Sequence, residues 1–117
     1  MRTQNDSLIS APISISGTWV SEPVWVNQDM AFSLQLTFES AIASCKIQVS
    51  NDNGRSQGQA PSGYKVTSWN DLDGSYTTMS GNGTGTYNVS EVNYAWIRVV
   101  IDGDLDLKTL RFNGKGV

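Results

Sequence analysis

The chain has 117 residues, of which 38% are hydrophobic and 16% charged, a composition that predicts one folded domain and excludes a disordered chain. Its formal net charge of -3 provides no basic field for a phosphate backbone, which argues against nucleic acid as a partner. With no histidine and a single cysteine, Cys45, the sequence predicts no internal disulfide, no zinc site and no cofactor.

The first ten residues are polar up to Leu8 and Ile9, and Pro12 then prevents a helix from forming. We interpret residues 1–10 as an extended N-terminal arm and residues 11–117 as a single domain. Leu8 and Ile9 are then candidate contacts of the arm with a partner. The arm lacks the apolar core of a secretory signal and no later run reaches the ~20 apolar residues of a membrane span, so we expect assembly in a cytoplasm.

The next segments alternate between apolar and polar residues, which is typical of strands. Short strands are predicted at Ile13 to Ser16, where serine instead of lysine on the polar face leaves a sheet edge unprotected, and at 18–20 and 24–26. The clearest strand is Met30 to Phe38, which has one apolar and one polar face. Alternation over 45–49 predicts another strand, which ends at a turn.

The second half is predicted to contain a long loop and then several short strands. Residues 55–63 have no large apolar anchor and form the loop, and Gly81-Asn82-Gly83 is expected to be a turn. The last third is predicted to be a hairpin with its turn at Asp102-Gly103. Its second strand changes parity, which indicates a bulge near Lys108 and Thr109.

About eight short strands and no helical pattern predict an all-β fold, an antiparallel β-sandwich of jelly-roll or discoidin-like type. Two patterns that resemble ligand sites are better explained by this fold. Asp102, Asp104 and Asp106 lack the rest of a calcium loop and are interpreted as a solvated hairpin turn. The glycine-rich run at 81–85 lacks the lysine and the following helix of a phosphate loop.

Catalysis is not expected from this sequence. Without histidine an enzyme would need a mechanism based on carboxylates alone, and no convergent pair of carboxylates is visible in the sequence. We therefore predict no catalytic residues and no metal ligands.

The best candidate contact surface lies on the strand that starts near Tyr94. Alternation places Tyr94, Trp96 and Arg98 on one face of that strand, where they form either a contact surface or the second packed face of a central strand. Trp19 and Trp25 have serine-rich surroundings. Each indole could stack on a sugar ring, fill a pocket of a neighbouring subunit or pack in the core.

Five short segments carry a resemblance to a known family, namely Gly17-Thr18-Trp19, Ser50-Asn51-Asp52, Trp69-Asn70-Asp71-Leu72, Tyr94-Ala95-Trp96-Ile97-Arg98-Val99-Val100 and Asn113-Gly114-Lys115-Gly116. In order and spacing the chain resembles small discoidin-like β-sandwich proteins of bacteriophage virions. The stretch from Asn53 to Ser68 departs from the family's pattern and predicts a loop that faces a receptor or partner.

The resemblance implies a structural protein of the virion: a capsid decoration or cementing protein, a spike or fibre base, or a tail accessory protein. Its expected partners are other virion proteins, such as the major capsid protein or tail and spike subunits. We also expect a homo-oligomer, for which a trimer would suit a capsid position. The alternative function is a carbohydrate-binding or host-receptor-binding module, in which tryptophans on the sandwich form a shallow site for a host glycan.

Overall fold

The computed structural model describes residues 3–26, 29–51, 68–90, 92 and 94–116. Within these ranges the chain forms one antiparallel sheet of seven strands and contains no helix. The strands are β1 (Thr3–Ser7), β2 (Ile13–Val20), β3 (Val24–Trp25), β4 (Asp29–Ser50), β5 (Asn70–Asp71), β6 (Thr77–Val89) and β7 (Trp96–Gly116). The predicted all-β sandwich is confirmed. The predicted loop at 55–63 lies outside the described residues, as does most of the stretch from Asn53 to Ser68.

The seven strands align into four long ribbons. β1, β2 and β3 follow one another along one side of β7, and β4 pairs with the other side. β5 and β6 both pair with the far side of β4. The residues of the predicted N-terminal arm therefore include a paired strand, because Thr3 lies opposite Lys115 and Ser7 lies opposite Arg111.

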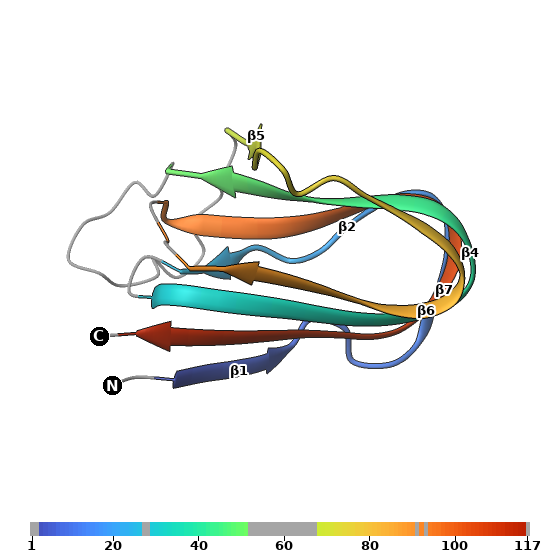
Figure 1. The fold of residues 1–117 in the computed structure, drawn as a ribbon, viewed down its shortest axis with the longest axis horizontal. Helices are drawn as coiled ribbons and strands as arrows, with labels where there is room; N and C mark the ends of the chain where they lie inside the picture. The colour runs from blue at the N-terminus through green and yellow to red at the C-terminus, as the bar shows by residue number, and fades with distance from the viewer. Residues whose placement is uncertain (1–2, 27–28, 52–67, 91, 93, 117) are drawn as a thin grey trace.

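The sheet folds over on itself to make the sandwich (Figure 1). β4 and β7 have 22 and 21 residues, and together with β6 they run through a bend at one end of the molecule and return. The first layer contains β1 and the paired segments 29–38 of β4, 83–89 of β6 and 107–116 of β7. The second layer contains β3, β5 and the other halves of the long strands. The same three strands thus build both layers.

The bend lies where four residues have positive φ angles. These are Gly17 at 97°, Ser40 at 54°, Gly81 at 69° and Gly103 at 131°. They are close in register, because Gly17 is opposite Gly103, Gly103 is opposite Ala43, and Ala41 is opposite Gly81. L-residues adopt such angles only with strain, so glycine is favoured at these positions.

Ser40 is the one non-glycine residue among them, and a side chain from the next strand supports its backbone. Its amide donates a hydrogen bond of 2.9 Å to Oδ1 of Asn82 on β6. The pairing of β4 with β6 shifts between Phe38 and Ala41, so the strand bulges at this point. An irregular β4 backbone at the bend is therefore held by β6.

Two predicted hairpin turns are wrong. Asp102-Gly103 and Gly81-Asn82-Gly83 lie within the continuous strands β7 and β6, at the bend. Aspartate, asparagine and glycine suit a strand that changes layers as well as they suit a tight turn, because both need a permissive backbone. The predicted bulge is confirmed, since Thr37 pairs with Thr109 and Phe38 with Leu107, which leaves Lys108 unpaired.

The core fills the space between the two layers. The predicted apolar face of Met30 to Phe38 contributes Phe32, Leu34, Leu36 and Phe38. The core also includes Ile47 of β4 and Ile97, Val99, Ile101, Leu105, Leu107, Leu110 and Phe112 of β7. Cys45 is buried among them, and this burial raises the pKa of its thiol to about 11. Burial therefore favours the protonated thiol at neutral pH.

Two buried serines bridge the breaks between strands of the same ribbon. Between β2 and β3, Val99 donates its backbone amide to Oγ of Ser21 at 2.9 Å. Between β5 and β6, Ile47 donates its amide to Oγ of Ser75 at 3.0 Å, and this hydroxyl donates to the Leu72 carbonyl at 2.7 Å. The hydroxyls satisfy backbone groups that would otherwise be buried without a partner.

Substitution of Gly103 is expected to destabilise the bend more than substitution of Gly17. A Cβ on Gly103 would lie 2.4 Å from the Ile42 carbonyl oxygen and 2.6 Å from Ala43 Cα, whereas a Cβ on Gly17 would meet nothing within 4 Å. Gly17→Ala should cost about 1–3 kcal/mol of backbone strain. Gly103→Ala should lose clearly more, because backbone atoms must move as well. Denaturant unfolding of both variants measures the difference, and equal losses would contradict a close packing of β7 on β4 at the bend.

Candidate functional site

The outer surface of the second layer carries an aromatic cluster, defined here as Trp25, Trp69, Trp96 and Arg98. The inward face of β7 contributes Ile97 and Val99 to the core, so Trp96 and Arg98 project outward. Trp25 on β3 is directly opposite Trp96. Backbone hydrogen bonds from Val26 to Ala95 at 2.8 Å and from Ala95 to Ser50 at 3.0 Å hold this end of the sheet together.

The two opposed indoles make an edge-to-face contact. The ring centroids of Trp25 and Trp96 are 4.9 Å apart, with 69° between the ring planes. Such a pair contributes about 0.5–1.5 kcal/mol beyond its area burial. Trp96 is only 7% exposed, although it is not part of the central core. The outer surface of a sheet therefore holds a tryptophan as deeply buried as a core residue.

Arg98 links this strand to the neighbouring segments. Its guanidinium lies 4.3 Å from the centre of the Trp69 ring, and its Nε donates a hydrogen bond of 2.8 Å to Oε1 of Gln48. Burial lowers the pKa of Arg98 from its usual value, yet arginine stays charged at any physiological pH. The cation is therefore fixed in one place by an aromatic ring and an amide.

A short polar network fixes the amide of Gln48 in turn. Nε2 of Gln48 donates to Oδ1 of Asp71 at 2.9 Å, and Nζ of Lys46 lies 3.1 Å from Oδ2 of the same carboxylate. The Gln48 hydrogen bond, followed by Lys46, lowers the pKa of Asp71 below its usual value. This network attaches β5, and with it Trp69, to β4.

Three buried polar atoms at this end of the sheet lack hydrogen-bond partners among the residues that the structure describes. Nε1 of Trp25, Nε1 of Trp96 and Oη of Tyr94 are buried, and no described residue forms a hydrogen bond with them. Burial also raises the pKa of Tyr94. Each unpaired buried donor costs about 1–3 kcal/mol. Natural folds rarely retain three such groups at one end of a sheet without a reason.

The predicted contact residues are only partly brought together. Trp96, Arg98 and Trp25 belong to the aromatic cluster, whereas Tyr94 and Trp19 pack against the core. Ile9 is a core residue and Leu8 packs beside it, with its amide bonded to the Leu110 carbonyl at 2.8 Å. Trp69, a member of the cluster, and Gln48, which accepts a hydrogen bond from Arg98, were not predicted as contact residues. Both reach Arg98 from other strands, and no local signal in the sequence marks them.

The large hydrophobic side chains exposed among the described residues lie on the same outer surface. They are Ile42, 81% exposed, Tyr76, 68% exposed, and Val20, 41% exposed. Ile42 and Tyr76 line a shallow hollow of about 440 Å³ with Ser44, Thr78 and Asp102. Val20 lies opposite Val100, which shares the outward face of β7 with Arg98. We call the outer surface of the second layer, with the aromatic cluster and these three residues, the aromatic face.

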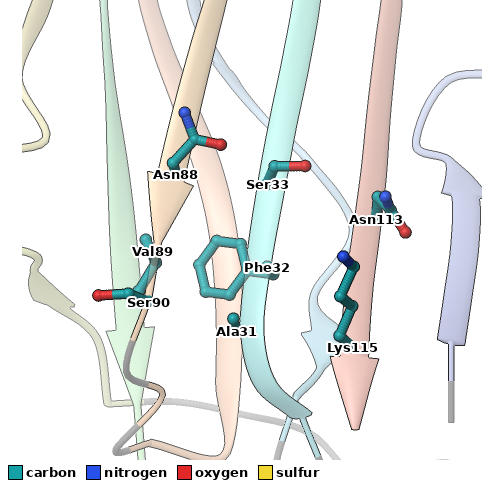
Figure 2. A pocket seen from close by; sticks show the side chains of 8 residues that line it. All are labelled: Ala31, Phe32, Ser33, Asn88, Val89, Ser90, Asn113 and Lys115. Atoms are coloured by element: carbon teal, nitrogen blue, oxygen red, sulfur yellow. The ribbon is translucent and has the colours of Figure 1, made fainter. Parts of the chain in front are cut away.

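The outer surface of the first layer is polar and is called the amide face. A hollow of about 520 Å³ opens on it, lined by Ser33, Asn88, Ser90, Asn113 and Lys115 together with Ala31, Phe32 and Val89. Figure 2 shows Asn88, Ser33 and Asn113 on three adjacent strands, and Ser33 is paired in register with both asparagines. Lys115 is the only charged residue among those named here. The hollow therefore offers amide and hydroxyl groups and one cation.

The aspartates of β7 do not form a hairpin turn, which corrects the interpretation of Asp102, Asp104 and Asp106. Thr18 donates to Oδ1 of Asp102 at 3.1 Å, and Ser14 donates to Oδ1 of Asp106 at 2.8 Å, so two of the carboxylates fasten β2 to β7. Across the described ranges no group of three or more acidic or cysteine side chains could hold a metal ion. The same ranges contain no helix that could cross a membrane.

No protein-family model and no curated protein matches the sequence.

The pKa of Asp71 is expected to depend on both Gln48 and Lys46. A lowered pKa means that the carboxylate adds stability above its unfolded value near 3.8, and this stability is lost as the pH falls through the folded pKa. Gln48→Ala and Lys46→Ala should each raise the pKa of Asp71 towards that value, because each removes a hydrogen bond to the carboxylate. An NMR titration of the carboxyl carbon measures both shifts. Lys108→Ala is the control, because Lys108 pairs with Glu39 instead. An unchanged pKa of Asp71 in both variants would contradict the polar network.

Proposed function

We propose that this protein is a structural protein of a bacteriophage virion that attaches to other virion proteins through its aromatic face. The observation that carries the proposal is the contrast between the two outer surfaces. The exposed large hydrophobics of the described chain, Val20, Ile42 and Tyr76, all lie on the outer surface that also carries the aromatic cluster. Exposed apolar side chains gathered on one side mark interaction surfaces, and tryptophan, tyrosine and arginine are enriched at them.

The pattern of the sequence supports the virion as the location. Five segments along the chain resemble small β-sandwich proteins of phage particles, and in such a particle this protein would act as a capsid decoration protein or as a base for a spike or fibre. Its action is binding and not catalysis. The acidic side chains at the bend support this view, because they fasten strands: Glu39 pairs with Lys108 at 3.6 Å, and Asp102 and Asp106 accept hydroxyl hydrogen bonds.

Charges placed on the aromatic face should prevent incorporation into the particle. Val20→Lys and Ile42→Lys leave the core intact, because both side chains are exposed, but they would bury an unpaired charge in the contact. We expect each to reduce the copies per particle at least about tenfold. Quantitative mass spectrometry of purified phage particles measures the copy number.

Gln35→Lys is the matched control, since Gln35 is exposed on the amide face of the same strand as Ile42. Equal loss with the control, or normal incorporation of both aromatic-face variants, would contradict the proposal. Deletion of residues 1–10 is a poorer test, because it also removes β1 and the buried Ile9.

A second candidate function, binding of a host glycan, is favoured by the hollow on the amide face. Side-chain amides and hydroxyls that accept and donate hydrogen bonds match the hydroxyls of a sugar, and apolar atoms of Phe32 and Val89 lie beside them. The tryptophans suit this function less well than the sequence suggests. Trp96 is almost fully buried, so it presents no flat ring to a sugar.

A glycan array probed with the purified protein tests this candidate. If a glycan binds, Asn88→Ala and Asn113→Ala should each weaken binding by roughly fivefold to tenfold, the effect of one lost hydrogen bond. Thr84→Ala, an exposed change on β6 away from the hollow, should leave it unchanged. The candidate fails if no glycan binds, or if the two asparagine variants bind as the wild type does.

A further inference from the structure

The outer edge of β6 is open along a long strand. In the described part of the chain β6 pairs only with β4, so its other edge carries no strand. The strand has 13 residues, Thr77–Val89, and contains no charged residue and no proline. Natural sheets usually protect such an edge with lysine, proline or a covering segment, because unpaired backbone groups are a template for another strand.

The opposite edge of the sheet is better protected. It is formed by β1, β2 and β3, which are separated from one another, with Pro12 between the first two and Pro23 between the last two. Proline lacks the N–H that a further strand would need. The sequence prediction of an unprotected edge at Ile13 to Ser16 therefore concerns the more interrupted of the two edges. β6 is the better candidate for strand addition.

The core also reaches the surface beside β6. A cleft of about 120 Å³ lies between the two halves of the bent strand, lined by Leu36, Phe38 and Cys45 of β4 and by Met79 and Tyr87 of β6. Gly83 and Gly85 leave only backbone over Phe38 and Leu36. Tyr87 and Val89 are only partly buried against the core. Apolar groups at this side of the sandwich thus remain partly open to solvent.

We propose that a second copy of this chain pairs antiparallel with β6 and closes the cleft. Strand addition along 13 residues would form about one backbone hydrogen bond per residue. A two-fold axis through Gly83, the midpoint of Thr77–Val89, makes the contact self-complementary. If this two-fold axis is perpendicular to the sheet, both copies bend at Gly81 towards the same side of the sheet.

A second copy of this chain fits this edge because the edge of β6 is complementary to itself. The strand is uncharged, so two copies meet without repulsion between like charges. In the two-fold register Met79 lies opposite Tyr87 of the other copy, and both side chains line the cleft that pairing would cover. Pairing would continue the sheet and the core across the axis in the same step.

Sedimentation velocity of the full chain from micromolar to millimolar concentration tests the pairing. We expect a concentration-dependent dimer, and hydrogen exchange at β6 that slows as the dimer forms. The double variant Thr84→Lys and Thr86→Lys places four lysines near the axis, and it should raise the Kd of the dimer about tenfold or more. Both threonines are exposed, so the fold is expected to tolerate the change.

Ser16→Lys, an exposed lysine on the opposite edge in β2, is the matched control and should leave the dimer unchanged. A monomer at all concentrations, or a dimer that the control weakens as much as the β6 variant, would overturn the proposal. Val20→Lys is expected to dimerise normally, so a failure of self-association is distinguishable from a failure of particle binding through the aromatic face.

Discussion

Four ribbons change direction along one line of the sheet, and every other part of the structure depends on how they do so. Gly17, Gly103 and Gly81, with Ser40, take backbone angles that most side chains exclude, and the pairing of β2, β7, β4 and β6 brings them into one row. The approach is closest at Gly103, where the backbone of β4 occupies the space of a side chain. Because the strands continue through this row, the spacing of the two layers and the alignment of their inner faces are set together.

The parts of the fold that could be predicted are those encoded over a few residues. The alternation from Met30 to Phe38 identifies the core face of β4, and the change of parity near Lys108 identifies a bulge, because side-chain period alone reveals both. The bend could not be predicted in this way. Asp102-Gly103 has the same local chemistry in a hairpin as in a strand that crosses between layers, and only the partners on either side distinguish the two.

The candidate site could likewise be predicted only where its residues lie on one strand. Trp96 and Arg98 were found because they alternate on one strand, and Trp25 was noted for its setting. Their neighbours Trp69 and Gln48 come from other ribbons, and register alone brings them to Arg98. A cluster assembled across strands has no signature in any single segment. Leu8 and Ile9 were predicted to contact a partner, but Ile9 lies in the core and Leu8 packs against it. Here too the packing depends on strands that are distant in the sequence.

The two outer surfaces of the sandwich differ in their chemistry. One surface presents indoles, aliphatic side chains and a fixed guanidinium, and the other presents hydroxyls, amides and Lys115. A protein with this contrast can be attached to a support on one side while the other side faces solvent or a ligand. Strand pairing along β6 would add neighbours within the plane of the sheet, so the three surfaces could be used at once without competing.

The position of β7 has a consequence for the way the chain folds. β7 is the last strand along the chain, yet it lies inside the sheet, and β1, β2 and β3 pair with no other described strand. Thr3 must meet Lys115, and Trp25 must meet Trp96, so each contact closes a long loop of chain. During synthesis the first three strands have no partner until β7 has left the ribosome. We therefore expect folding to be slow and late, with uncovered strand edges of the nascent chain prone to aggregation.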